Sequence, residues 1–366
     1  METGRVIMHV DIDYFFAQCE EIVNPLLKEK PVVICVYSGR SEDSGAVSTA
    51  NYIARKYGVK SGMPIAFAKR MLKDIDAAFL PVNRELYEEI SKRVMNILRR
   101  NSDRIAQESI DEAFLDVSKR VGGVFKSAEM LAYSVKEEIK KNEHLTCSIG
   151  IGPNKVIAKI ASDYRKPDGL TVIRPDEVKS FLDPLPVDKL YGVGKKTSKR
   201  LQDLGVTTIG DLAHYDAERL KQIFGGKIGL YFHRAANGMD EEPVQEREMV
   251  EQVSRIITLK QDTRDPVIIS LELDRICSDI RARLIEENLL YRSVGILAID
   301  NKLEIRSRTK TLERPSEDLE MIRGTARELL LKFLEEEGDV VLRRFGVKVS
   351  GLLRKAKKGS LTKFLE

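Results

Sequence analysis

Short apolar runs alternate with charged amphipathic stretches along the first half of the chain. Runs at 6–10 and 146–151 are rich in β-branched residues and predict buried strands. Amphipathic stretches at 83–101 and 126–141, and a shorter one near 155–163, predict helices. Strands and helices in this order predict an α/β (α+β) fold whose sheet has helices on one face, although periodicity alone does not determine the strand order.

A further stretch, 104–117, has strand character that is interrupted by Asp111 and Glu112. Neither acid favours a strand, and the pair lacks the glycine or asparagine of a tight hairpin turn. A solvated bend is the ordinary explanation for an isolated acidic pair. A second acidic site upstream favours a functional explanation.

The second acidic site follows the apolar run at 6–10, where Asp11 and Asp13 are separated by one residue. Side chains alternate faces along a strand, so both aspartates would point the same way if the strand continued that far. Two strands that deliver carboxylates to one sheet edge can hold Mg²⁺, and two such ions about 4 Å apart are typical of nucleotidyl transfer. Carboxylates clustered without a cation would repel one another.

Two longer motifs carry a resemblance to a known family. Residues 8–21 read MHVDIDYFFAQCEE and residues 109–116 read SIDEAFLD. Together they strongly resemble the Y-family DNA polymerases and, within them, the archaeal DinB (polymerase IV) branch. Shorter matching pieces follow in the family's order at 38–40, 44–58, 148–155, 166–169 and 192–194.

The resemblance implies a right-hand polymerase of several domains, and 366 residues exceed what one hydrophobic core normally supports. The polar, acidic composition after Gly238 predicts an interdomain linker. The expected parts are a ferredoxin-like palm (1–13 and 82–170), small fingers (14–81), a helical thumb with a helix-hairpin-helix (171–237), the linker (238–248), an α/β little finger (249–353) and a C-terminal tail (354–366).

The activity that the resemblance implies is template-directed addition of dNTPs to a primer 3′ end, with low fidelity, synthesis across damaged bases and no proofreading exonuclease. Two Mg²⁺ ions would be held by Asp11, Asp111, Glu112 and the backbone carbonyl of Ile12. A nucleotidyl cyclase would share the paired carboxylates without needing the basic modules that follow Gly192. A DNA-binding protein with a dead active site would lack one of the three carboxylates.

The fingers region is expected to hold the incoming nucleotide. A helix predicted from near Ala46 to Gly58 places Tyr52 and Arg55 on one face, which from spacing alone could be ordinary surface. The resemblance makes this face, together with Lys166, the clamp for the triphosphate, and the guanidinium fork suits phosphate oxygens. Lys166 lies in a predicted loop at 165–169, and a lone lysine in a loop is usually solvated.

A bulky aromatic at Phe16 matches the family's steric gate, which excludes the 2′-hydroxyl of a ribonucleotide. The alternative is a core aromatic of the first helix, predicted from Tyr14 to Val23. By resemblance, Phe15, Ser44 and Ala46 also belong to the nucleotide site.

Two regions are expected to bind primer-template DNA. Gly192, Gly194 and Lys195 resemble a helix-hairpin-helix turn that grips phosphates, although a Gly-x-Gly alone usually marks only a tight turn. Further on, strands are predicted near 292–299 and 303–309 and a helix at 317–335. Three cations alternate along the second of these strands, and a phosphate backbone would relieve their repulsion. These cations are Arg306, Arg308 and Lys310.

The tail follows a final strand predicted at 347–353. Leu361, Phe364 and Leu365 have the i, i+3, i+4 spacing of an anchor that enters a hydrophobic groove. They resemble a sliding-clamp (PCNA) interaction box, except that Lys358 stands where Gln is usual and Leu365 replaces an aromatic. A solvated terminus is the alternative, and we expect the tail to bind the clamp.

Composition adds little to these expectations. Charge is nearly balanced, with 61 Lys+Arg against 57 Asp+Glu, so net charge alone does not indicate a nucleic-acid partner. The 4 cysteines are widely spaced, which fits reduced thiols and argues against a zinc site. Because the first apolar run is too short for a signal peptide or membrane span, we expect a cytoplasmic protein with no membrane partner. We also expect a monomer.

Overall fold

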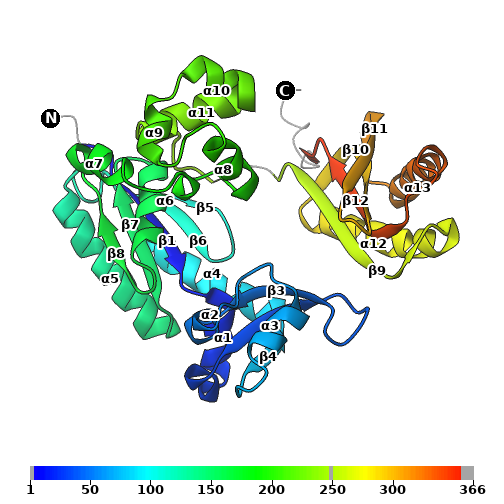
Figure 1. Cartoon of the computed structure of the whole chain (residues 1–366), viewed down its shortest axis with the longest axis horizontal. Helices are drawn as coiled ribbons and strands as arrows, with labels where there is room; N and C mark the ends of the chain where they lie inside the picture. Colours follow the sequence, from blue (N-terminus) through cyan, green and yellow to red (C-terminus); the bar gives the residue numbers. More distant parts are fainter. Residues whose placement is uncertain (1–3, 247–249, 356–366) are drawn as a thin grey trace, which may run out of the picture. The chain divides into compact units, whose positions relative to one another are not determined.

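The computed structural model describes residues 4–246 and 250–355. The chain divides into two compact units, one made of residues 1–36 and 46–246 and the other of residues 37–45 and 247–366 (Figure 1). Within the described residues, no helix combines the length and apolar character needed to cross a membrane.

The centre of the first unit is a five-stranded sheet in the order β5-β6-β1-β7-β8. The central strand β1 is buried along its whole length and runs antiparallel to both β6 and β7, whereas β7 and β8 are parallel. The strands are β1 (Ile7–Ile12), β5 (Arg104–Gln107), β6 (Glu112–Asp116), β7 (Cys147–Gly152) and β8 (Leu170–Val172).

Helices cover both faces of this sheet, which corrects the expectation of helices on one face. Met8 and Val10 pack in one apolar cluster with residues of α4 and α5, whereas Ile7 packs in another with Ala158 of α6. All six residues of β1 are buried, so both faces of the strand are covered. The helices are α4 (Arg84–Arg100), α5 (Phe125–Glu143) and α6 (Lys155–Tyr164), close to their predicted ranges.

The stretch at 104–117 is a hairpin of β5 and β6, whose register pairs Gln107 with Ala113. The connection between the strands is a longer bend that needs no glycine at its tip. Asp111 belongs to this bend, so the expectation that a turn would not account for the acids was wrong for Asp111. The Ser109 hydroxyl accepts a hydrogen bond from the Asp111 amide at 3.2 Å and closes this bend. Glu112 is the first residue of β6.

The fingers region holds a three-stranded sheet in the order β3-β2-β4. The helix predicted from Ala46 was wrong, because Gly45–Ala50 is a strand and the helix starts only at Tyr52. Val47 and Thr49 favour the strand, and the Asn51 side chain caps the helix by accepting from the Ala54 amide. The elements are α1 (Phe15–Val23), η1 (Pro25–Glu29), β2 (Val32–Tyr37), β3 (Gly45–Ala50), α2 (Tyr52–Lys56), α3 (Ile65–Met71) and β4 (Ala78–Pro81).

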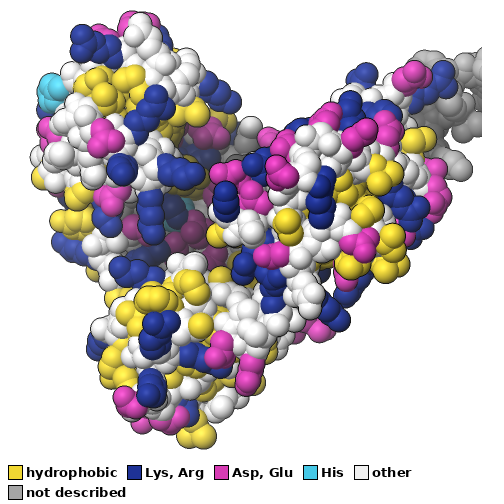
Figure 2. Space-filling view, turned by 45° about the vertical axis from the view of Figure 1, so that its right-hand side comes forward, with side chains coloured by type: hydrophobic (Ala, Val, Ile, Leu, Met, Phe, Trp, Pro, Cys, Tyr) yellow, Lys and Arg dark blue, Asp and Glu magenta, His cyan; other side chains and the backbone are white. Residues whose placement is uncertain are grey.

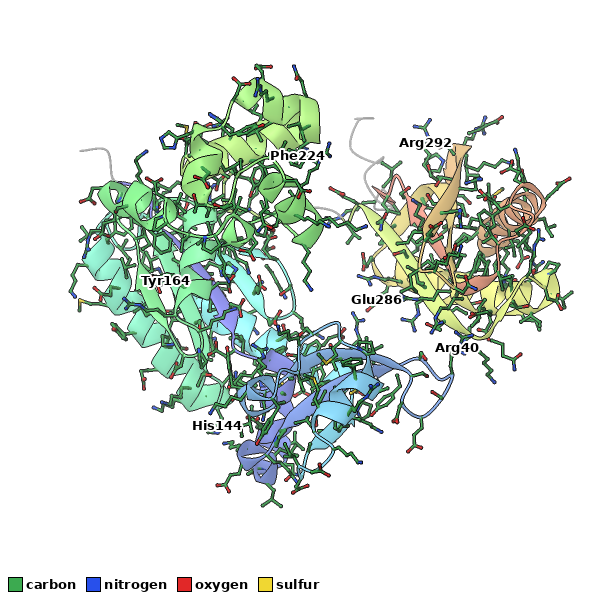
Figure 3. The ribbon with its side chains drawn as sticks, viewed as in Figure 1. Arg40, His144, Tyr164, Phe224, Glu286 and Arg292 are labelled. Atoms are coloured by element: carbon green, nitrogen blue, oxygen red, sulfur yellow. The ribbon has the colours of Figure 1, made fainter. Side chains whose placement is uncertain are left out.

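The thumb region is built of short helices, and their apolar cluster also includes residues of α6 such as Val156 and Ile160. Tyr164, which is labelled in Figure 3, is the last residue of α6. Its ring packs edge to face on Phe181 of α7, with ring centroids 5.2 Å apart. The elements are η2 (Pro175–Glu177), α7 (Val178–Leu182), η3 (Val187–Lys189), α8 (Lys195–Gln202), α9 (Ile209–His214), α10 (Ala217–Phe224) and α11 (Gly226–Ala236).

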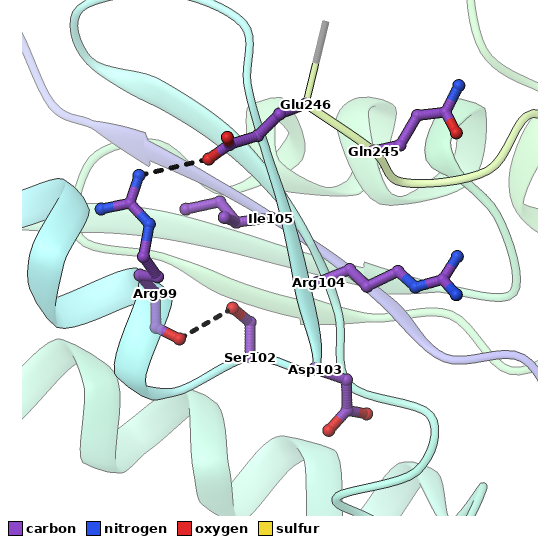
Figure 4. Close-up of a pocket in the computed structure, with 7 residues that line it drawn as sticks. All are labelled: Arg99, Ser102, Asp103, Arg104, Ile105, Gln245 and Glu246. Carbon is purple, nitrogen blue, oxygen red and sulfur yellow. Dashed lines mark hydrogen bonds and ion pairs between the residues drawn. The ribbon is translucent and has the colours of Figure 1, made fainter. Parts of the chain in front are cut away.

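Much of the predicted linker contacts the first unit. The Val244 side chain is 1% exposed and packs with Ile7 and Phe114 on the α6 side of the sheet. Two residues further on, Glu246 pairs with Arg99 at 3.2 Å beside a pocket of about 510 Å³ (Figure 4). Although its composition is polar, this segment is therefore packed on the first unit as far as residue 246.

The second unit is an antiparallel sheet in the order β11-β10-β12-β9, with α12 and α13 packed on one face. The two strands predicted at 292–309 are present and longer than expected, and the helix predicted at 317–335 is present at 319–336. No element had been predicted for 252–286. The elements are β9 (Gln252–Thr263), α12 (Pro266–Glu286), β10 (Leu289–Asp300), β11 (Ile305–Ser316), α13 (Leu319–Glu336), β12 (Leu342–Ser350) and β13 (Leu353–Arg354).

Candidate active site

Three carboxylates meet where β1 and β6 lie side by side. Asp11 and Glu112 are directly opposite each other in the antiparallel register, and the Ile12 amide donates to the Asp111 carbonyl at 3.0 Å. Like charges directly opposite on neighbouring strands are destabilising unless a cation lies between them. These residues, including Ile12, line a pocket of about 290 Å³.

Two lysines supply positive charge to this cluster. Lys166 Nζ lies 2.6 Å from Asp11 Oδ2, and Lys159 Nζ contacts Glu112 Oε2 and lies 3.8 Å from Asp11 Oδ2. Lys166 was expected near the site, but Lys159 was not. Lys159 and Ser162 are three residues apart, so their side chains lie on the same side of α6, which faces the sheet. This spacing is the feature of the sequence that could have identified Lys159.

His9 lies beneath the carboxylates, although the sequence analysis gave it no role. Its Nδ1 is 2.8 Å from Ser162 Oγ, and its Nε2 is 3.4 Å from Glu112 Oε2. Burial lowers the pKa of His9 to about 4, so the imidazole is neutral at physiological pH. The ring packs edge to face on Phe114, which holds it in place.

Burial also shapes the titration of the acids. It raises the pKa of Asp11 to about 7, only partly offset by the Lys166 ammonium, and it raises the pKa of Asp111. Burial acts in the same direction on Glu112, but the His9 ring and the Lys159 ammonium beside it hold the pKa of Glu112 below its usual range. The pKa values of Asp11 and Asp111 are therefore raised, whereas that of the neighbouring Glu112 is lowered.

The donor set fits hard divalent cations, since carboxylate and carbonyl oxygens are the ligands that Mg²⁺ prefers. In the described part of the chain, no group of three or more His, Cys, Asp or Glu side chains is arranged so that it could hold a metal ion. The ammonium groups against Asp11 and Glu112 show that this cluster is already compensated by positive charge.

Asp13 does not join the cluster, because β1 ends at Ile12 and the chain turns. Its carboxylate is 1% exposed and accepts hydrogen bonds from the hydroxyls of Thr146 and Ser148 at 3.0 and 2.8 Å. The strand does not continue to Asp13, so Asp11 and Asp13 do not share a face.

An aromatic wall closes one side of the pocket. Phe16 stacks on Tyr87, with centroids 4.4 Å apart and planes 14° from parallel, and the Tyr87 hydroxyl donates to Glu20 at 2.7 Å. Phe16 lines the pocket and also packs against the core, so both interpretations of this residue hold in part. Phe15 is buried in the core and reaches the pocket wall.

Tyr52, Arg55 and Lys166 also line the pocket. The Arg55 guanidinium lies 4.8 Å from the Tyr52 ring centroid, and its Nε donates to the Ala50 carbonyl at 2.9 Å. Two cations here can meet a polyanionic ligand.

Ser44 and Ala46 are not among the residues that line this pocket. The Ser44 hydroxyl accepts from the Ser41 amide at 2.8 Å and closes its own loop, while Ala46 pairs with Pro64 in a β-bridge. The strand geometry of β3 brings its later residues to the pocket instead. The sequence analysis missed the lining residues Tyr14, Ser48, Thr49, Ser61 and Ile110.

The predicted hairpin turn of the thumb leads into α8. Gly192 has a φ of +88°, which favours glycine, and a Cβ there would lie 3.2 Å from the Tyr231 ring. Gly194 precedes the helix, and Lys195 is its first residue. The turn is therefore formed as the motif predicts, and its contact with DNA stays a prediction.

Arg306, Arg308 and Lys310 share one face of β11, but acids relieve their repulsion. Arg306 pairs with Asp300 and Glu304 at 3.0 and 2.8 Å, and the other two pair with residues of or beside α13. These pairs are Arg308 with Glu336 and Glu337 at 3.2 and 3.1 Å, and Lys310 with Glu328 at 2.7 Å. Basic and acidic side chains are accordingly intermixed on the surface in Figure 2. These acids already relieve the repulsion that phosphate was expected to relieve, and DNA binding by Arg306, Arg308 and Lys310 stays a prediction.

The other face of this sheet, which we call the outer face, lies opposite α12 and α13. Phe345 and Val347 point into the core, so alternation places Arg344 and Lys348 on the outer face. Lys348 lies across Gly295, where an added Cβ would be 2.9 Å from the lysine Cε. Leu361, Phe364 and Leu365 lie outside the described residues.

Comparisons with known proteins cover nearly the whole chain. The impB/mucB/samB family model matches residues 10–163, its C-terminal domain model matches 250–362, and the thumb domain of DNA polymerase-iota matches 188–240. "DNA polymerase IV" of Nitrosopumilus maritimus is 45% identical over 353 residues, covering 96% of both chains. "DNA polymerase IV" of Saccharolobus solfataricus is 38% identical over 348 residues, covering 95% of this chain and 96% of that one.

Solved structures agree with these relatives. A chimera of the Y-family DNA polymerases Dbh and Dpo4 has a TM-score of 0.90 at 38% identity, covering 96% of this chain and 100% of its own. An insertion ternary complex of Dbh DNA polymerase has a TM-score of 0.68 at 38% identity over the same shares. These matches favour a polymerase over the cyclase and the inactive DNA-binding protein. The chain therefore belongs to the impB/mucB/samB family and is a Y-family, low-fidelity DNA-directed DNA polymerase of the archaeal DinB branch.

Proposed function

We propose that the pocket beside β1 and β6 is the site of nucleotidyl transfer, with Asp11, Asp111, Glu112 and the Ile12 carbonyl as ligands of two Mg²⁺ ions. The observation that carries this assignment is the direct cross-strand pairing of Asp11 and Glu112 against lysine ammonium groups. Held by these residues, the metal ions would lower the pKa of the primer 3′-hydroxyl and would offset charge on the leaving pyrophosphate.

Tyr52, Arg55 and Lys166 bind the triphosphate in this proposal. Lys166 is within reach because its ammonium already lies at Asp11, and exchanging a carboxylate for phosphate keeps its charge compensated. Arg55 offers a fork to phosphate oxygens, and the ring of Tyr52 beneath the guanidinium limits its rotation.

Phe16 acts as the steric gate. Its stacking on Tyr87 fixes the plane of the ring, and the hydrogen bond from Tyr87 to Glu20 anchors that support. A rigid ring at this wall excludes a 2′-hydroxyl by bulk alone, since phenylalanine has no hydroxyl to contribute.

Primer-template DNA is held by the thumb turn and the outer face of the second unit. Gly192, Gly194 and Lys195 would meet phosphates through backbone amides and one ammonium. On the outer face, Arg344 and Lys348 are better placed for phosphate than Arg306, Arg308 and Lys310, whose charges are paired within the sheet and α13.

The tail binds a sliding clamp through Leu361, Phe364 and Leu365, on the strength of their spacing alone. Clamp-stimulated primer extension should disappear when residues 359–366 are deleted, while extension without the clamp is retained. Equal stimulation of both proteins would contradict this proposal.

Primer extension on undamaged and lesion-bearing templates, with Mg²⁺ titrated from zero, tests the function as a whole. We expect Mg²⁺-dependent extension and incorporation opposite at least one lesion. Failure to extend an undamaged primer with any dNTP would contradict the assignment of the pocket.

A further inference from the structure

The loop that carries Lys166 is held by a buried carboxylate that the proposed chemistry does not use. Asp13 Oδ2 accepts from the Asp168 backbone amide at 2.8 Å and from the Thr146 hydroxyl at 3.0 Å. Its Oδ1 accepts from the Ser148 hydroxyl at 2.8 Å, and Ser148 Oγ in turn accepts from the Gly169 amide at 3.2 Å. One carboxylate thus binds two amides of this loop, one directly and one through a hydroxyl.

The loop adopts a backbone conformation that needs such support. Asp168 has a φ of +54°, in the left-handed region that costs energy for a non-glycine residue. Gly169 packs so closely that a Cβ there would lie 2.0 Å from the Arg165 carbonyl oxygen. The loop is therefore folded tightly upon itself directly beside Lys166.

A second support comes from α5. Lys136 Nζ donates to the Asp168 carboxylate at 2.6 Å, to the Gly169 carbonyl at 3.4 Å and to the Cys147 carbonyl. Asp13 and Lys136 therefore hold neighbouring atoms of the same two loop residues from different elements, and neither lines the nucleotide pocket.

We propose that Asp13 is a positioning residue that presents Lys166 to the triphosphate, with Lys136 as its counterpart on α5. Asp13 follows Asp11 by two residues, so its hydrogen bonds connect the end of β1 to the loop and set the distance from Asp11 to the Lys166 ammonium. This inference rests on the proposed role of Lys166 in triphosphate binding.

The test measures dNTP binding without chemistry, in a complex of the full chain with Mg²⁺ and a primer-template that ends in a dideoxynucleotide. Asp13→Asn keeps the size of the side chain, but an amide can offer oxygen on one side only, so an acceptor is lost. We expect Asp13→Asn and Lys136→Met each to weaken dNTP binding on the order of tenfold, because each removes a charge-assisted hydrogen bond. Primer-template affinity should stay within about twofold.

Thr146→Val is the matched control, since it removes one donor to Asp13 without touching the loop. It should change dNTP affinity less than Asp13→Asn does. The decisive comparison is with Lys166→Met, which should itself weaken dNTP binding and should abolish any further effect of Asp13→Asn. A merely structural role would instead give additive losses and weaken primer-template binding equally.

The outcomes separate the two levels of inference. If Lys166→Met weakens dNTP binding but Asp13→Asn does not, or if their effects add, the positioning role is wrong and the clamp assignment stands. If Lys166→Met leaves dNTP affinity unchanged, the role of Lys166 fails, and with it the role of Asp13.

Discussion

The sheets of the two units both gather opposite charges, but they do so in different settings. In the first unit, Asp11 and Glu112 meet two lysines beside a pocket that is open to a ligand. In the second unit, the cations of β11 meet acids at the surface, as Lys310 and Glu328 do. Ion pairs of the second kind contribute little and need no ligand. Ion pairs of the first kind lie at a pocket, so a charged ligand that enters it can take the place of either partner.

The largest expected effect comes from breaking the first cluster. Glu112→Gln keeps the shape of the side chain but removes a charged ligand, so primer extension should fall on the order of a thousandfold or more. Primer-template affinity should stay within about threefold, because other parts of the chain hold DNA. Single-turnover extension and a DNA-binding titration measure the two quantities.

The matched change in the second unit is Glu328→Gln, which releases Lys310 from its ion pair. It should leave the extension rate within about twofold, since surface pairs contribute little. Comparable losses in both variants would mean that the contrast between the units is wrong.

The next effect concerns the pocket wall. Phe16→Ala opens space where the 2′-hydroxyl would lie, so discrimination against rNTPs should fall by about ten- to a hundredfold. Incorporation ratios for paired dNTP and rNTP substrates measure this. Phe67→Ala, at an aromatic that is 50% exposed on the fingers, is the control and should leave discrimination unchanged. Unchanged discrimination in Phe16→Ala would remove Phe16 from the gate.

A smaller effect distinguishes the two faces of the second sheet. Lys348→Met should weaken DNA binding several-fold and reduce the slope of log affinity against log salt by about 1. Arg308→Met should leave that slope unchanged and lower stability by less than about 1 kcal/mol, because its pairs with Glu336 and Glu337 lie at the surface. If Arg308→Met changed the salt dependence of DNA affinity more than Lys348→Met does, the DNA contact would lie on β11 instead of the outer face.

The smallest effect concerns Asp211, a carboxylate whose pKa is lowered, whereas that of Asp11 is raised. Hydrogen bonds from the Thr208 and Thr207 amides lower the pKa of Asp211 from 3.8 to about 2, whereas burial raises the pKa of Asp11. Because the folded pKa is the lower one, the stabilisation by Asp211 is present above pH 3.8 and is lost as the pH falls through about 2. Asp211→Ala should therefore lower the Tm slightly at pH 7 and by less at pH 2.5. An equal Tm difference at both pH values would contradict this.

The sequence alone determined much of this protein, because its patterns are local. The periodicity of 83–101 and 126–141 predicted α4 and α5, and the apolar run before Asp11 predicted β1. The motifs at 8–21 and 109–116 carried the resemblance to the family. Local signals failed where a neighbour decides the outcome. Val47 and Thr49 form a strand because β2 pairs beside them, although the stretch was expected to be helical.

Only the tertiary structure decided which charges meet. The register of β1 on β6 sets Asp11 opposite Glu112, and α6 brings Lys159 to them from a distant part of the chain. The end of β1 at Ile12 turns Asp13 away from the cluster, and the side on which α13 packs gives Arg308 its acidic partners. Each of these outcomes depends on residues far apart in the sequence, and a pattern of neighbours carries no information about which distant side chain supplies the opposite charge.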